Sequence, residues 1–182
     1  NNLSLNSGGD MQLTAVNLSA GRSASLISGG NLTLDTAKDI TSHNQSAGRN
    51  INQAYDETVL GTNLKAGGNI TLAATNATLP SPAGRGAGGE GSGNINLMSA
   101  NLTSDTGKLT IIADNTLNIG TTAEKHTSLV QTYSESSGFM SSSSSTNRTE
   151  TWRTNQIGSS LNANSISFSS GQDINITGSD IT

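Results

Sequence analysis

The chain has 182 residues, a formal net charge of −4 at neutral pH and no cysteine. Hydrophobic residues make up 31%, aromatic residues 3% and charged residues 12% of the sequence, whereas Ser, Thr, Asn and Gly fill about half of it. The lack of cysteine excludes a disulfide framework, a thiolate metal site and a cysteine nucleophile. The scattered charges form no basic stripe, so no nucleic-acid partner is expected. Two interpretations remain: polar low complexity, or a fold with a small core.

A short phrase recurs along the chain, made of Gly, a second small or polar residue, Asn or Asp, and then two apolar residues separated by one polar residue. The first apolar residues of the first five copies are Met11, Leu32, Ile51, Ile70 and Ile95. They are spaced by about 20 residues, except across the last interval, where the Pro/Gly-rich stretch 80–93 predicts a surface loop. A fixed period of this length is typical of a solenoid.

Further apolar residues divide each period. Leu18 follows Met11, and Ile40 follows Leu32, at intervals of seven and eight residues. This pattern predicts an all-β solenoid with three short strands per coil of about 20 residues. Alternation within 69–72 sends the apolar residues inward and Thr outward, while Gly and Asn allow the sharp corners. Stacked Asn side chains are expected to form hydrogen-bonded ladders. The few aliphatic residues are then enough to fill the narrow core.

The repeat lapses from about residue 121 to 161. Two halves rich in Thr and aromatic residues predict a β-hairpin near 123–160, outside the coils, with a Gly/Ser loop at 136–147. A disordered serine linker is the alternative. The large side chains of this segment predict either packing on the solenoid or a partner-contact surface, and the candidate contact residues are Tyr133, Phe139, Met140, Trp152 and Arg153.

No catalytic, cofactor-binding or metal-binding residue is predicted. The segment 86–91 matches GxGxxG, but prolines precede it and a strand follows it, which is the wrong context for a dinucleotide site. His43 and His126 lack partners at metal-ligand spacing. The acidic residues mostly flank strands and corners, although carboxylates of adjacent coils could assemble a carbohydrate-active site. The many Asn-x-Ser/Thr triplets follow from corner Asn residues rather than from glycan attachment.

The repeated Gly-Gly-Asn-Ile/Leu-x-Leu phrase resembles the haemagglutinin repeats of filamentous haemagglutinin and its relatives, the exoproteins of bacterial two-partner secretion. The segment from Glu124 through Met140 and the following serines resembles the extra segment in the second repeat region of contact-dependent growth-inhibition effectors. The resemblance implies a right-handed parallel β-helix, secreted through an outer-membrane partner and displayed at the bacterial surface. Residues 1–182 are then expected to be a single β-helix segment of a longer exoprotein.

The resemblance further implies a structural and adhesive role, or delivery of a C-terminal toxin to a neighbouring cell. The implied partners are the outer-membrane transporter and a receptor or the outer membrane of the target cell, and exposed strand edges predict end-to-end self-association of the segment. Two alternatives remain open. One is a carbohydrate-active β-helix enzyme, and the other is a module that inserts into an outer membrane.

Overall fold

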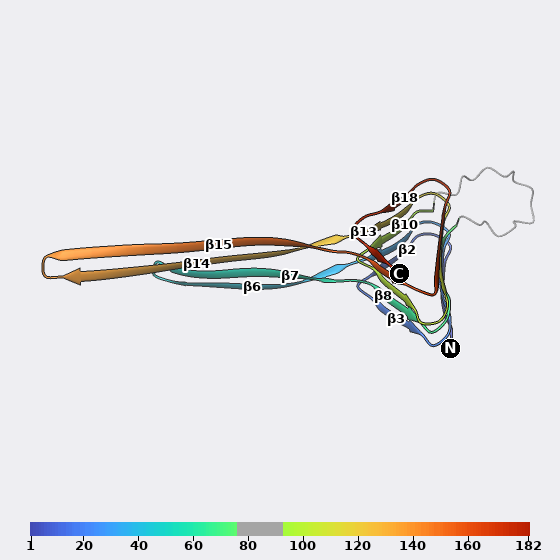
Figure 1. The fold of residues 1–182 in the computed structure, drawn as a ribbon, viewed down its shortest axis with the longest axis horizontal. Helices are drawn as coiled ribbons and strands as arrows, with labels where there is room; N and C mark the ends of the chain where they lie inside the picture. Colours follow the sequence, from blue (N-terminus) through green and yellow to red (C-terminus); the bar gives the residue numbers. More distant parts are fainter. Residues whose placement is uncertain (76–92) are drawn as a thin grey trace, which may run out of the picture. The chain divides into compact units, whose positions relative to one another are not determined.

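The computed structural model describes residues 1–75 and 93–182, which form strands and no helix. The chain divides into two compact units (Figure 1). The solenoid unit contains Asn1–Ala37, Leu60–Thr122 and Ile157–Thr182, and the hairpin unit contains Lys38–Val59 and Ala123–Gln156. The loop predicted at 80–93 lies outside the described residues, apart from Gly93.

Three five-stranded parallel sheets form the solenoid unit. Sheet A contains β1 (Leu3–Ser7), β4 (Ala24–Ser28), β9 (Ile70–Ala74), β12 (Lys108–Ala113) and β17 (Ser165–Ser170). Sheet B contains β2 (Met11–Thr14), β5 (Leu32–Asp35), β10 (Ile95–Met98), β13 (Leu117–Gly120) and β18 (Ile174–Ile176). Sheet C contains β3 (Asn17–Ala20), β8 (Asn63–Ala66), β11 (Asn101–Ser104), β16 (Ser160–Asn162) and β19 (Asp180–Ile181). The chain visits the sheets in the order A, B, C, and each circuit adds one strand to every sheet, as in a β-solenoid.

The register of the coils differs from the prediction at two of the five phrases. Met11, Leu32 and Ile95 occupy equivalent positions in sheet B. Ile70 instead pairs with Ala24 in sheet A, and Ile51 lies in the hairpin unit. The equivalence predicted for Ile51 and Ile70 is therefore wrong. The physical reason is that every corner requires a tight turn followed by in–out alternation, so the same phrase fits more than one corner.

Inward-facing aliphatic side chains stack in register from coil to coil. In sheet A, Leu72 of β9 pairs with Leu26 of β4 and with Ile111 of β12, and all three side chains are fully buried. The same is true of Leu97 in sheet B. The predicted inward orientation of Leu72 is confirmed. Within residues 1–75 and 93–182, the large fully buried side chains are all Leu or Ile, which explains why so few apolar residues suffice for this interior.

Asparagine side chains form ladders on the outside of the coils. Asn101 donates its Nδ2 to Oδ1 of Asn63, and Asn63 donates to Oδ1 of Asn17, each at 2.7 Å. A second ladder runs from Asn175 through Asn118 to Asn96, and a third runs from Asn115 through Asn94 to Asn31. These contacts confirm the predicted ladders. Several Asn residues of the Asn-x-Ser/Thr triplets therefore have a structural role.

The corner between sheets B and C differs among the coils, and three residues, 177–179, close it between β18 and β19. In two coils, two residues close it, and one of them has a positive φ: Ala15 (φ 52°) precedes β3, and Ser99 (φ 47°) precedes β11. In two other coils, a hairpin is inserted at the same corner, between β5 and β8 and between β13 and β16. Gly61 and Gly158 follow these hairpins, and a Cβ at either position would overlap a backbone carbonyl of the next coil.

We expect Gly158→Ala to lower the free energy of unfolding of the solenoid by about 1–3 kcal/mol, because the added Cβ would clash with the carbonyl oxygen of Gly178. Thermal unfolding followed by circular dichroism measures this change. Gly9→Ala is the matched control, since nothing lies within 4 Å of a Cβ added there. Equal stability of the two variants would contradict the close contact at Gly158.

Truncation of Leu72 to Ala is expected to cost about 2–5 kcal/mol of stability, because it leaves a cavity between two neighbouring coils. Leu72→Asp or Leu97→Asp is expected to unfold the neighbouring coils, since the buried charge would have no partner. Ser19→Asp is the control, because Ser19 is exposed and lies opposite Lys65 in sheet C. An unchanged melting curve for Leu72→Asp would contradict the coil register.

Candidate functional site

The hairpin unit is built from two hairpins that form one four-stranded sheet in the order β15, β14, β7, β6. The first hairpin is β6 (Ala37–Ala47) and β7 (Asn50–Leu60), and the second is β14 (Thr122–Gly138) and β15 (Ser141–Ile157). Antiparallel pairing of β7 with β14 joins them. The second hairpin occupies the segment predicted near 123–160. The predicted Gly/Ser loop at 136–147 is wrong, because Ser141–Ser145 belong to β15 and only Phe139 and Met140 form the turn.

The first hairpin has no counterpart in the sequence predictions. Ile40 and Val59 follow Leu32 and Ile51 at intervals that match the spacing of strands in a coil, so the pattern predicts coils for this segment. A usable signal was the Gly48-Arg49 pair, which forms the turn between β6 and β7 with Gly48 at φ 61°. A second signal was the run of polar residues from 41 to 46, which provides nothing to bury inside a coil.

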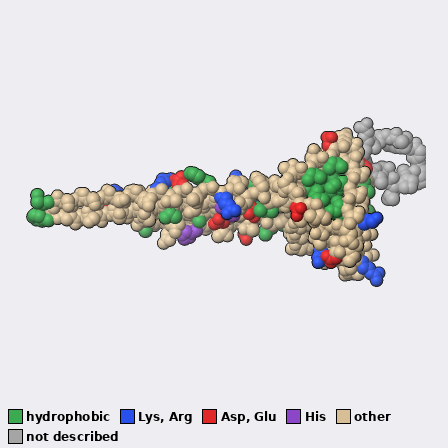
Figure 2. Space-filling view, viewed as in Figure 1, with side chains coloured by type: hydrophobic (Ala, Val, Ile, Leu, Met, Phe, Trp, Pro, Cys, Tyr) green, Lys and Arg blue, Asp and Glu red, His purple; other side chains and the backbone are tan. Residues whose placement is uncertain are grey.

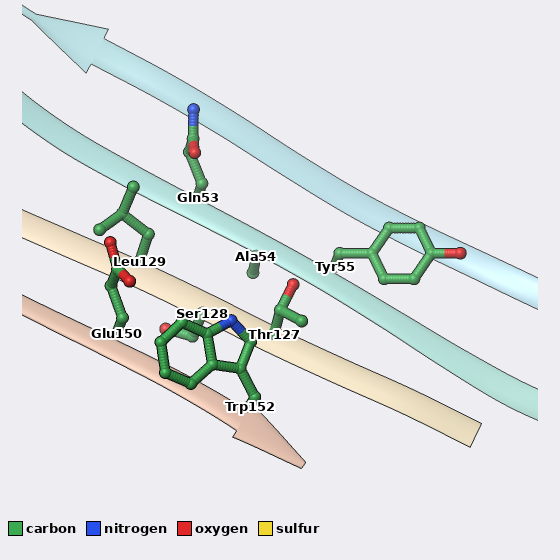
Figure 3. A pocket seen from close by; sticks show the side chains of 8 residues that line it. All are labelled: Gln53, Ala54, Tyr55, Thr127, Ser128, Leu129, Glu150 and Trp152. Carbon is green, nitrogen blue, oxygen red and sulfur yellow. The ribbon is translucent and has the colours of Figure 1, made fainter. Parts of the chain in front are cut away.

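One face of the hairpin sheet carries an open groove of about 300 Å³, which we call the Trp152 groove (Figure 3). Across β14 and β7, Thr127 lies opposite Tyr55 and Leu129 lies opposite Gln53. The two-residue turn at 139–140 places Trp152 beside Thr127 on the neighbouring strand β15. The residues that line the groove are Gln53, Ala54, Tyr55, Thr127, Ser128, Leu129, Glu150 and Trp152. Trp152 is 74% exposed, so its indole forms an accessible wall of the groove.

The opposite face carries His126, Asp56 and Arg153, because residues alternate between the faces of a strand. His126 donates a hydrogen bond from Nδ1 to Oδ1 of Asp56, 3.0 Å away. Arg153 lines a second cavity of about 250 Å³ with these two residues. Trp152 and Arg153 are neighbours in the sequence but project to opposite sides of the sheet, so they cannot join one flat contact surface.

The other three predicted contact residues lie elsewhere on the second hairpin. Phe139 and Met140 form its turn and are fully or almost fully exposed, and Figure 2 shows apolar side chains gathered at that end of the hairpin. Tyr133 is half-buried, with the guanidinium of Arg49 over its ring at 4.6 Å from the centroid. The five predicted residues therefore lie in four separate places, and Phe139, Met140 and Trp152 are exposed rather than packed.

A polar cluster around Glu57 borders the Trp152 groove. Lys38 donates from Nζ to Oε2 of Glu57 at 2.7 Å, and the Tyr55 hydroxyl donates to Oε1 at 2.8 Å. The backbone N–H of Lys125 donates to Oε2 at 3.0 Å. These hydrogen bonds, that from Lys38 above all, lower the pKa of Glu57 to about 2, and the hydrogen bond to Glu57 raises the pKa of Tyr55.

The described residues contain no group of three or more His, Cys, Asp or Glu side chains that could hold a metal ion. His43 lies exposed in β6. Asp10 serves a corner, where its Oδ1 accepts a hydrogen bond from the backbone N–H of Asn31. The GxGxxG segment at 86–91 lies outside the described residues. In ranges 1–75 and 93–182, no helix has the length and apolar character needed to cross a membrane.

Comparison with known protein families finds one family that matches this chain. The family described as Hemagglutinin repeat matches residues 1–52 and 46–182. The chain belongs to the Hemagglutinin repeat family. Hemagglutinin repeats are structural and adhesin elements rather than enzymes. No curated protein and no solved structure matches this Hemagglutinin repeat chain.

Acid is expected to weaken the hairpin unit through Glu57. Because the pKa of Glu57 is about 2 in the fold and 4.5 ordinarily, its carboxylate stabilises the sheet fully above about pH 4.5. This contribution is lost as the pH falls toward 2. The NMR shift of the Lys125 amide, measured from pH 6 to pH 1.5, should follow this loss, and Glu57→Gln should abolish the change.

Asp105→Asn is the control for this titration. Asp105 pairs with Lys65 in the solenoid unit at 3.2 Å, but both side chains are largely exposed, so removal of this ion pair should leave the Lys125 profile unchanged. A Lys125 midpoint near pH 4.5 would contradict the hydrogen bonds assigned to Glu57.

Proposed function

We propose that this chain is a shaft and contact segment of a large bacterial exoprotein that is exported by two-partner secretion and displayed on the cell surface. The observation that carries the proposal is the match of the Hemagglutinin repeat family over the whole chain. In this proposal the segment mediates adhesion or helps to deliver a C-terminal toxin to a neighbouring cell. Its partners are the outer-membrane transporter during export and the surface of the target cell afterwards.

The stacked coils support the shaft role. Each coil contacts its neighbours through three parallel sheets, so stability and length grow by addition of coils. We further propose that the coils are right-handed, since connections between parallel strands of one sheet have this hand in about 98% of cases. The absence of cysteine suits export of an unfolded chain, because no disulfide can form before it leaves the periplasm.

The hairpin unit supports the contact role. The solenoid buries most of its large aliphatic side chains and leaves a few Ile side chains partly exposed, whereas the hairpin unit exposes its aromatic and Met side chains Trp152, Phe139 and Met140 far more. Exposed aromatic and Met residues are enriched in binding surfaces. Figure 2 shows that much of the hairpin surface is polar and uncharged, with scattered charged side chains, and that the solenoid also carries an apolar patch. The hairpins are therefore the elements most suited to recognition.

Insertion of the second hairpin into the outer membrane of a target cell is a second candidate function. Strand length favours it, because β14 and β15 have 17 residues each, more than the about 9–11 residues that a spanning strand needs. Co-sedimentation of the chain with liposomes tests this candidate. Binding that is absent, or that does not depend on the hairpins, would remove it.

A hairpin-free variant tests the contact role. Residues 36–62 would be replaced by Ala-Val and residues 121–159 by Ser-Ala, the pairs that close the same corner at 15–16 and 99–100. We expect the variant to keep a cooperative thermal transition, because Asp35 and Asn63 then occupy the positions of Thr14 and Asn17. Its binding to bacterial cells and cultured host cells should fall at least about tenfold, measured by flow cytometry of the labelled protein.

Two results would overturn the contact role. If the folded hairpin-free variant bound cells as well as the full chain does, the hairpins would not be the contact elements. If the full chain bound neither kind of cell, this segment would not be adhesive.

A further inference from the structure

The Trp152 groove combines an exposed indole with small polar side chains. Two rows of side chains cross its floor, Trp152–Thr127–Tyr55 and Glu150–Leu129–Gln53 (Figure 3). Each row takes one residue from each of the strands β15, β14 and β7. The groove is therefore fixed by strand register, and hydrogen-bonded strands hold its shape before any ligand arrives.

The lining has no excess charge. Glu150 is paired with the guanidinium of Arg148, which lies on the same face two residues earlier. Gln53 donates from Nε2 to Oδ1 of Asn44 at 3.1 Å, and its carboxamide also carries a second N–H and a carbonyl oxygen. A groove of this kind offers hydrogen-bond donors and acceptors without attraction for an ionic ligand.

This chemistry matches a sugar better than a lipid or an ion. A pyranose ring has an apolar face of C–H groups, which stacks on an indole, and a rim of hydroxyl groups, which both donate and accept hydrogen bonds. The groove has the matching parts, since Trp152 offers the flat apolar wall and Thr127, Gln53 and Glu150 surround it with polar atoms. Its volume of about 300 Å³ is at the lower end of small-molecule sites.

We propose that the Trp152 groove binds a neutral hexose glycan, with Trp152 stacked on one sugar ring and Glu150 and Gln53 bonded to its hydroxyl groups. This inference deepens the proposed contact role and rests on it, because it names the ligand class that the hairpin unit recognises. Tyr55 forms the far border of the groove, where the hydrogen bond from its hydroxyl to Glu57 holds the ring in place.

The single tryptophan of the chain provides a direct test, because intrinsic indole fluorescence then reports on this groove alone. The full chain would be titrated with oligosaccharides released from mannan, dextran and galactan, and with heparin as an anionic probe. We expect at least one neutral oligosaccharide to shift the emission to shorter wavelength in a saturable way. No saturable shift with any neutral probe would overturn the inference, as would a shift with heparin alone.

Single-residue variants test where the glycan binds. Their affinity for the glycan would be measured by calorimetry and by electrophoresis in gels that contain the polysaccharide identified in the titration. Trp152→Ala should weaken binding about tenfold or more, and Glu150→Gln should weaken it by a smaller factor. Arg153→Ala, on the opposite face, and Phe139→Ala, in the turn, should bind as the original chain does. Equal losses in Trp152→Ala and Arg153→Ala would overturn the inference. The thermal midpoint of Trp152→Ala should stay unchanged, because the side chain is 74% exposed.

The cell-binding assay separates this inference from the proposed function. If the chain binds cells through its hairpins but binds no glycan, the proposal of a sugar ligand is overturned and the contact role stands. A protein surface would then be the partner. Glycan binding at Trp152 by a chain that binds no cells would support the sugar site and overturn adhesion.

Discussion

The solenoid depends on one constraint: an inward side chain is fully buried only where the equivalent side chains of the coils before and after it lie in register and the other two sheets close the core. Leu26, Leu72 and Ile111 show this arrangement, since they pair in register across three strands of sheet A and exclude water completely. A shift of one residue would turn each aliphatic side chain outward. The glycine contacts at the corners and the external amide ladders all serve to keep this register.

The constraint explains which features could be predicted from the sequence. Leu72 is recognisable as an inward residue because alternation is local, and the Asn ladders follow from repeated corner residues. The assignment of Ile51 and Ile70 failed because one phrase satisfies the demands of different corners. Periodicity therefore predicted the architecture, whereas the register depends on pairings between residues far apart in the chain.

The site was less accessible to sequence reasoning. Trp152 is recognisable because a large aromatic residue falls where the repeat lapses. Tyr55 and Gln53, which line the same groove, come from a hairpin whose apolar spacing matches that of a coil. Nothing local connects Lys38 with Glu57 or with the Lys125 amide. The sequence predicts too long a turn for the second hairpin, because a serine run favours a loop, whereas backbone pairing lets serine continue a strand.

The amide ladders all have the same direction. In each ladder the asparagine of a later coil donates to the asparagine of an earlier one, as from Asn101 to Asn63 and from Asn63 to Asn17. A coil that has already formed thus presents a row of acceptor oxygens to the chain that follows it. The solenoid is a polar template, and a chain that emerges with its N-terminal coils first meets an ordered surface at every step of its assembly.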